Sequence, residues 1–292
     1  MIDRLLLLYP SGYRAAYGSE IADTYREMTR GAPRGARLRE GLDLAAHAVR
    51  VRFQLRSADP LGRFLASAAP FALAAAAVSA ASQLLRWCTS IVVSPTPWML
   101  SIRTLDHVGA LSLLFSLLVC IGAMVALTGR WAVGVAAAVC GLCGTAGLAL
   151  SVEWLFGDRV IVPLAALLTV AVVLACPADL RPDGSASAAA GAMAWAAWLP
   201  AAVVETRIVQ GVSTHYGAWP LLALTMTGVV LALRAKSSGV CTLGAMAVAS
   251  PPFIAHAYVM AWHDLRPVAA MVLVFPAAVV ITATVARARR SP

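Results

Sequence analysis

After Asp59 the chain alternates between long apolar stretches and short polar connections. Each stretch is close to the roughly 20 residues that an α-helix needs to cross the hydrocarbon core of a bilayer. Short connections make successive helices antiparallel neighbours. The pattern therefore predicts an all-α fold, a polytopic membrane bundle of about eight spans, at residues 64–85, 108–128, 132–152, 160–177, 186–205, 217–233, 240–261 and 267–286.

Residues 1–60 have a different, amphipathic character and predict a small cytoplasmic helical domain ahead of the bundle at residues 61–292. A short helix over Ile2–Tyr9 is expected to end at Pro10, because a proline disfavours helix in the residue before it. Gly18 followed by Ser19 predicts a helix stop and a new start. A further helix from Ser19 is expected to end near Gly31.

A third helix is predicted after Gly35, with a narrow apolar stripe and several arginines around it. Two interpretations stay open: a basic amphipathic helix on the inner leaflet, or the closing helix of a three-helix domain. A domain of about 60 residues has a marginal core, so both can hold. The stripe consists of Leu38, Leu42, Ala45, Val49 and Phe53.

The N-terminal segment is dense in tyrosines, and Tyr13 and Tyr17 are spaced to share one helical face. With Tyr9, Ile21 and Tyr25 they are expected to form the small core of the domain. Tyr13, Tyr17 and Tyr25 are also the residues on which we place docking of a cytoplasmic protein partner.

Composition supports a membrane location independently. The chain has 292 residues, 60% hydrophobic and 13% charged, with a mean hydropathy of +0.79. That much apolar surface needs the lipid bilayer as solvent.

Basic residues collect on one side of the predicted bundle. The N-terminal segment, alternate connections and the C-terminal end hold all but five of the 23 Lys and Arg residues. The positive-inside rule then places both termini in the cytoplasm. The net charge of +9 is accounted for by flanks that face anionic lipid, so we do not expect nucleic-acid binding. The five on the other side are Arg86, Arg103, Arg159, Arg207 and Arg266.

The segment from Arg4 to Glu27 carries the pattern L-x-x-L-Y-P-x-x-x-R-x-x-Y-G-x-E and ends with Thr24, Tyr25, Arg26 and Glu27. It resembles a short N-terminal segment of bacterial multi-spanning membrane proteins, many from high-GC Gram-positive (actinobacterial) organisms. It is similar to the prefix of some large export-type permeases, and to cytoplasmic helical domains of membrane proteins that accompany small transcriptional regulators. The resemblance implies the bacterial cytoplasmic membrane, but this chain lacks the large periplasmic domain of the permeases.

Two features inside the spans predict close packing or a distortion. The third span carries small residues at intervals of three and four, which let another backbone approach and predict a central helix. The seventh span contains Pro251 and Pro252, which are expected to kink or break the helix. The small residues are Gly134, Ala138, Gly141, Gly144 and Gly147.

Histidines and acidic residues lie at the predicted outer ends of the spans. His256 and His263 share one helical face, and Glu205 ends the fifth span, so these three are the candidates for a metal site or a sensor. The simpler interpretation is that they sit at the water interface. No cofactor is expected, and the sequence carries no phosphate loop, nucleophile elbow or H-E-x-x-H motif.

Three classes of function follow. We favour a non-enzymatic regulatory, sensory or accessory membrane protein that couples the bundle to a cytoplasmic partner, because the N-terminal domain is separately patterned. The alternative is a transporter or permease subunit, supported by the number of spans and the break at Pro251. A membrane-embedded enzyme that uses the outer histidines and acids is third. The sequence leaves a homo-oligomer open.

Overall fold

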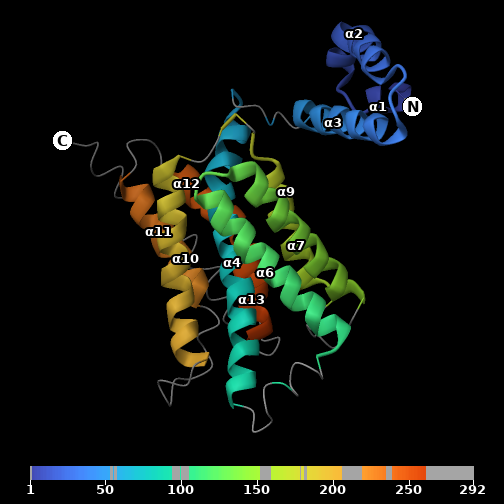
Figure 1. Ribbon diagram of the computed structural model, residues 1–292. Helices are drawn as coiled ribbons and strands as arrows, with labels where there is room; N and C mark the ends of the chain where they lie inside the picture. The colour runs from blue at the N-terminus through green and yellow to red at the C-terminus, as the bar shows by residue number, and fades with distance from the viewer. Residues whose placement is uncertain are drawn as a thin grey trace, which may run out of the picture. The chain divides into compact units, whose positions relative to one another are not determined.

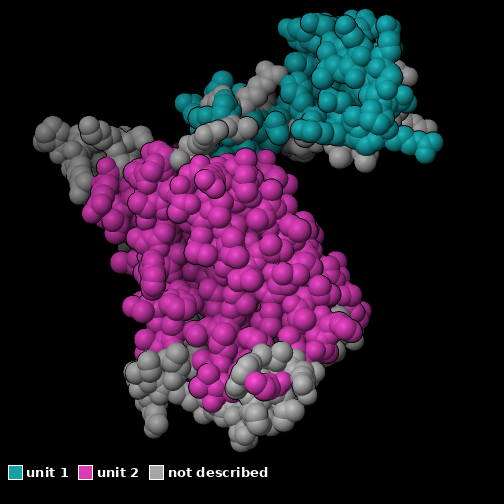
Figure 2. Space-filling view, in the orientation of Figure 1, with its two compact units in different colours: residues 1–63, 175–180 teal, residues 64–174, 181–292 magenta. Residues whose placement is uncertain are grey.

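A computed structural model describes most of the chain, which we call the described part. It comprises residues 2–52, 55, 58–93, 99, 105–151, 159–177, 179–180, 183–205, 219–234 and 239–260. Its regular secondary structure is helical, and the described residues contain no β-strand, as the apolar pattern predicted. It divides into two compact units, one of residues 1–63 with 175–180 and one of residues 64–174 with 181–292 (Figure 2).

The first unit contains α1 (Ile2–Leu6), α2 (Ser11–Thr29) and α3 (Arg34–Arg52). The predicted helix stop at Gly18 and Ser19 is wrong, because α2 runs through both residues. A glycine inside a helix costs about 1 kcal/mol relative to alanine, which weakens a helix without ending it. Gly18 is buried, and its missing side chain leaves space for the side chain of Arg14. A Cβ atom at Gly18 would lie 3.3 Å from Cγ of Arg14.

The end of α2 follows the predicted position. The last helical residue is Thr29, and Gly31 has a φ angle of 77°, a left-handed conformation that glycine adopts at little cost. The Arg30 N–H donates to the carbonyl oxygen of Glu27 and closes the last turn.

The second unit is a helical bundle. In the view of Figure 1, α4 lies between α10 and α11 on one side and α6, α7 and α9 on the other. A continuous core joins residues from these helices and from the last described helix, including Leu73, Ala138, Met193, Leu224 and Phe253. The bundle helices are α4 (Pro60–Val93), α6 (His107–Leu127), α7 (Trp131–Ser151), α9 (Ile161–Leu174), α10 (Gly184–Glu205), α11 (Trp219–Arg234), α12 (Gly239–Ala249) and α13 (Pro251–Met260).

By length and composition, three of the described helices can cross a membrane, namely α4, α6 and α7. The bent pair of α12 and α13 makes a fourth if it counts as one span. The apolar helices α9 and α11 are shorter than a span requires. Helix α10 is not among the helices that are both long and apolar enough to cross a membrane. The predicted span at 267–286 lies outside the described residues. The structure therefore agrees with a membrane protein and supports three to four of the spans.

Helix α4 is longer and more buried than expected. It continues through Arg86 to Val93, beyond the predicted end at residue 85, because the next helix breakers along the chain are Pro95 and Pro97. Of its most apolar 18-residue window 61% is buried, against 39% for α7. The prediction of α7 as the central helix is thus corrected in favour of α4. Its run of alanines keeps α4 thin, so neighbours approach from several sides.

The glycines of α7 have a narrower role than predicted, since they allow close contact with α6. A Cβ at Gly134 would meet the backbone nitrogen of Ala126 and lie 2.5 Å from the carbonyl oxygen of Gly122. A Cβ at Gly122 would lie 2.5 Å from the nitrogen of Ala138. Only hydrogen fits between these two backbones. Gly147, by contrast, has open space beside it.

Helices α12 and α13 meet at Ser250, where their axes bend by 49°. Pro251 and Pro252 have no N–H to donate, so the α-helical hydrogen-bond ladder cannot continue through them. The Ser250 carbonyl oxygen accepts from the N–H groups of Phe253 at 2.9 Å and Ile254 at 3.0 Å, which starts α13 afresh.

Candidate functional site

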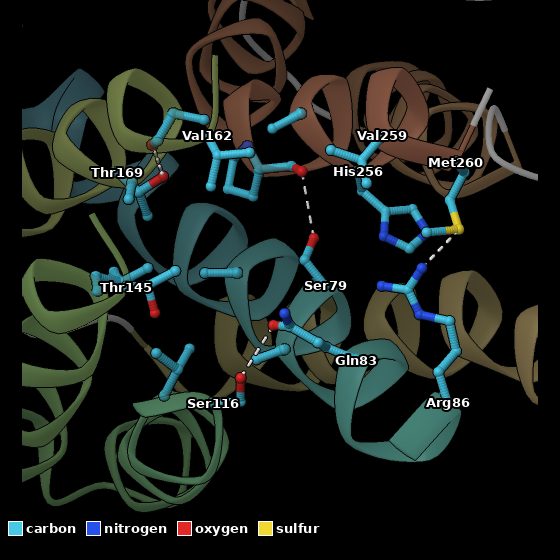
Figure 3. Close-up of a pocket in the computed structure, with 18 residues that line it drawn as sticks. Ser79, Gln83, Arg86, Ser116, Thr145, Val162, Thr169, His256, Val259 and Met260 are labelled. Atoms are coloured by element: carbon cyan, nitrogen blue, oxygen red, sulfur yellow. Dashed lines mark hydrogen bonds between the residues drawn. The ribbon is translucent and has the colours of Figure 1, made fainter. Parts of the chain in front are cut away.

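One pocket lies inside the bundle, between α4, α6, α7, α9 and α13, and we call it the bundle pocket (Figure 3). Its volume is about 110 Å³. Most of its wall is apolar. Helix α4 contributes three polar side chains, and α6, α7, α9 and α13 contribute one each. The lining residues include Ser79, Gln83, Arg86, Ser116, Pro252 and His256.

Hydrogen bonds tie the helices around the bundle pocket together. The Ser79 hydroxyl on α4 lies 3.2 Å from the carbonyl oxygen of Pro252 on α13, and 3.2 Å from that of Ala75 in its own helix. The Ser116 hydroxyl on α6 donates to Oε1 of Gln83 over 3.1 Å. The first of these bonds reaches a carbonyl oxygen beside the helix break, so α4 is anchored to the start of α13.

His256 lies on α13 and faces the pocket (Figure 3). Its side chain is buried, with 7% exposed, and its Nε2 has no hydrogen-bond partner among the described residues. Most buried polar groups in folded proteins are paired, and one left unpaired costs about 1–3 kcal/mol. The imidazole therefore presents an unused hydrogen-bonding atom.

Arg86 lines the same pocket, and its charge acts on the imidazole of His256. One of its guanidinium N–H groups donates to the sulfur of Met260 at 3.2 Å (Figure 3). The described lining residues include no Asp or Glu.

The predicted metal candidates are only partly described. His256 lies in the bundle pocket, whereas His263 and the side chain of Glu205 lie outside what the structure describes. Within the described residues no group of three or more His, Cys, Asp or Glu side chains could hold a metal ion. The three-residue metal site stays a prediction.

The three docking tyrosines lie in one groove of the first unit. Tyr13, Tyr17 and Tyr25 line a space of about 460 Å³ between α2 and α3, which we call the aromatic groove. Tyr13 and Tyr17 have ring centroids 4.9 Å apart, which fits the helical face they were predicted to share. The other lining residues are Tyr9, Glu20, Ile21, Thr24, Met28, Glu40, Asp43, Leu44 and His47.

Tyr9, which precedes α2, connects this part of the chain to α3 at one end of the aromatic groove. This side chain is buried, and its hydroxyl lies 2.8 Å from Nδ1 of His47 and 3.3 Å from the carbonyl oxygen of Leu44. Burial, with a smaller contribution from Tyr13, raises the pKa of the Tyr9 phenol above its ordinary value. Tyr17 is 49% exposed, so the groove has a fixed end at Tyr9 and an open aromatic end.

Sequence reasoning counted Arg86 only as an outer charge and passed over Ser79, Gln83 and Ser116. The available signal was a glutamine within a predicted span, since a polar side chain among apolar ones in a membrane helix often marks a functional site.

No protein-family model, curated protein or solved structure matches this chain.

Proposed function

We propose that this chain is a non-enzymatic, multi-pass membrane protein with a regulatory or accessory role, which docks a cytoplasmic protein through the aromatic groove. Three apolar helices and the bent pair of α12 and α13 support the membrane bundle. We retain about eight spans, with both termini cytoplasmic, because the remaining apolar stretches and the distribution of basic residues favour that topology. The resemblance of the N-terminal segment to that of bacterial membrane proteins agrees with this proposal.

The observation that carries the docking role is the composition of the aromatic groove. Tyr13 and Tyr17 line the groove, and the Tyr17 ring is exposed. On binding, a tyrosine ring buries a large area at little loss of side-chain freedom. Three carboxylates, Glu20, Glu40 and Asp43, line the same groove, and no Lys or Arg does so among the residues that the structure describes. An amphipathic helix with apolar residues on one face and basic residues beside them complements such a groove. The partner we propose presents a basic helix of this kind.

The test separates the two units. Deleting residues 1–58 should leave a protein that inserts into the membrane but no longer co-purifies with its partner. The substitution Tyr17→Ala should reduce co-purification in the same way. Ala15→Ser is the matched control, since Ala15 is exposed on α2 and does not line the groove. If the deleted protein is degraded or fails to insert, the first unit supports the bundle and the docking role is rejected.

A transport role is the second candidate, favoured by one observation. The break at Ser250 lies next to the bundle pocket, and broken membrane helices can form substrate sites. Transport requires that the pocket open alternately to both sides of the membrane. In a background without native cysteines, Ser116→Cys should react with an impermeant reagent from both sides if the protein transports, and from one side at most if it does not.

A further inference from the structure

Helix α3 carries its positive and negative charges on different faces. It contains five arginines and two acidic residues, and both acidic residues, Glu40 and Asp43, line the aromatic groove. All five arginines are exposed, and none of them forms an ion pair among the described residues. The positive charge of α3 therefore lies on the surface of the first unit, outside the groove. The arginines are Arg34, Arg37, Arg39, Arg50 and Arg52.

Four of these arginines form two rows along the helix, which we call the arginine rows. Arg39 and Arg50 are separated by about three helical turns and make one row. Arg34 and Arg52 are separated by about five turns and make the other. An apolar stripe with basic residues on both sides is typical of helices that lie in the interface of a bilayer. The positions that fall between the rows at helical register are Leu38, Leu42, Ala45 and Val49.

The arginine rows and the aromatic groove lie on different sides of α3. Glu40, Asp43 and His47 line the groove, and the middle of this set lies roughly 140° around the helix axis from the middle of the two rows. A surface that contacts the arginine rows therefore leaves the groove open to a protein partner.

The chain keeps α3 close to a membrane surface. Helix α3 ends at Arg52, and α4, which can cross a membrane, begins at Pro60. The connection between them spans at most roughly 30 Å when fully extended. This tether gives the arginine rows a high effective concentration at the bilayer surface. Guanidinium groups bind phosphate oxygens through two parallel hydrogen bonds, so anionic phospholipid headgroups complement the rows in both charge and geometry.

We propose that α3 binds the headgroups of anionic phospholipids through the arginine rows and so turns the aromatic groove toward the cytoplasm. The inference rests on the proposed function for the cytoplasmic placement of the first unit, but it does not require an occupied groove. If docking fails, Tyr17→Ala leaves co-purification unchanged and the lipid contact persists. The failure of either proposal is therefore recognised separately.

The experiment measures the distance of α3 from lipid in the full-length protein, in a background without native cysteines. Gly35→Cys carries a fluorophore, and the nanodiscs contain a nitroxide-labelled lipid that quenches it. Gly35 is exposed, has open space beside it and falls between the arginine rows at helical register. We expect stronger quenching in discs with about one third phosphatidylserine than in discs of phosphatidylcholine alone.

Salt and a second label position test the origin of the quenching. Salt at about 0.5 M should abolish the difference between the two kinds of disc, because it shortens the screening length to roughly 4 Å. The same fluorophore on Thr24→Cys, in the groove, should be quenched less than the fluorophore on Gly35→Cys.

Two pairs of substitutions test the assigned residues. Each basic residue at an anionic surface strengthens association about fivefold, so Arg39→Gln with Arg50→Gln should weaken the lipid contact about twentyfold. Quenching at position 35 should then fall to its value in phosphatidylcholine discs. Arg26→Gln with Arg30→Gln is the matched control, because it removes the same charge from exposed arginines at the end of α2 and should leave the quenching unchanged.

Three results would overturn the proposal. The first is equal quenching at position 35 in the two kinds of disc at low salt. The second is equal quenching at positions 24 and 35. The third is an equal loss of quenching in the control pair and in the α3 pair. Circular dichroism establishes that each variant keeps its helices. If the first α3 pair does not fold, Arg34→Gln with Arg52→Gln removes the other row and decides the outcome.

Discussion

The hydroxyl of Ser79 on α4 lies 3.2 Å from the carbonyl oxygen of Pro252 on α13, and so joins the most buried helix to the start of the helix that follows the break. Pro251 and Pro252 leave carbonyl oxygens near the bend without their usual helical donors. These carbonyl oxygens lie four residues earlier, and that of Ala247 accepts instead from the Ser250 hydroxyl over 2.7 Å. The Ser79 bond is a further contact, which joins α4 to α13.

The first prediction concerns this hydrogen bond. Ser79→Ala should lower the free energy of unfolding by about 0.6 kcal/mol, the average for hydrogen bonds between membrane helices. Ser67→Ala is the control, because the Ser67 hydroxyl is exposed and bonds only within α4, to the carbonyl oxygen of Phe64. Unfolding in a detergent titration measures both, and an equal loss in the two variants would contradict a bond that joins two helices.

The second prediction concerns the contact between α6 and α7. Gly134→Ala should destabilise the protein by about 1–3 kcal/mol, since a methyl group there overlaps the backbone of α6. Gly147→Ala should be neutral or stabilising by up to about 1 kcal/mol, because its surroundings are open and alanine is the better helix former. The same unfolding titration compares them. The packing we describe is incorrect if Gly134→Ala is tolerated as well as Gly147→Ala.

The third prediction concerns pH and the first unit. Because the pKa of Tyr9 is raised in the folded protein, the folded state holds the phenol proton more tightly than the unfolded state does. The corresponding stability is present below the ordinary tyrosine pKa of about 10, and it is lost as the pH rises through the raised value. Ultraviolet titration should therefore show one phenol that ionises later than most. That late phase should disappear in a Tyr9→Phe protein and persist in a Tyr17→Phe protein.

The fourth prediction concerns topology. Cysteines placed singly in a background without native cysteines should be protected from an impermeant reagent at positions 130, 180, 236 and 290, and labelled at positions 95, 157, 212 and 264. The reason is the gathering of basic residues on one side of the bundle. Labelling of position 290 from outside would mean an odd number of spans and would reject the eight-span topology.

Local patterns in the sequence predicted the all-helical character of the described residues and three of their membrane-spanning helices. The long apolar stretches give α4, α6 and α7, and the four-residue spacing of Tyr13 and Tyr17 gives their ring contact. Boundaries that depend on packing were less predictable. Gly18 did not end α2, because its small size leaves space for the Arg14 side chain and a single glycine weakens a helix without ending it.

The bundle pocket could not be predicted, because its residues are far apart in the sequence. Arg86 and His256 come together only through the packing of α4 against α13, and no spacing rule connects them. The three tyrosines of the aromatic groove could be identified because they lie close together in the sequence, on α2. Two of the carboxylates that line the groove with them could not be identified in this way. Glu40 and Asp43 come from α3, a different helix.

The central claim is that a cytoplasmic protein occupies the aromatic groove. A photo-crosslinking phenylalanine analogue at position 17, in the groove, should capture one cytoplasmic protein in intact cells, and the crosslinked peptide should map to a basic amphipathic helix. The same analogue at position 15, outside the groove, should capture none. Charge reversal by Glu40→Lys with Asp43→Lys should abolish the crosslink from position 17. Equal capture from positions 15 and 17, or a crosslink that survives the charge reversal, would contradict docking in the groove.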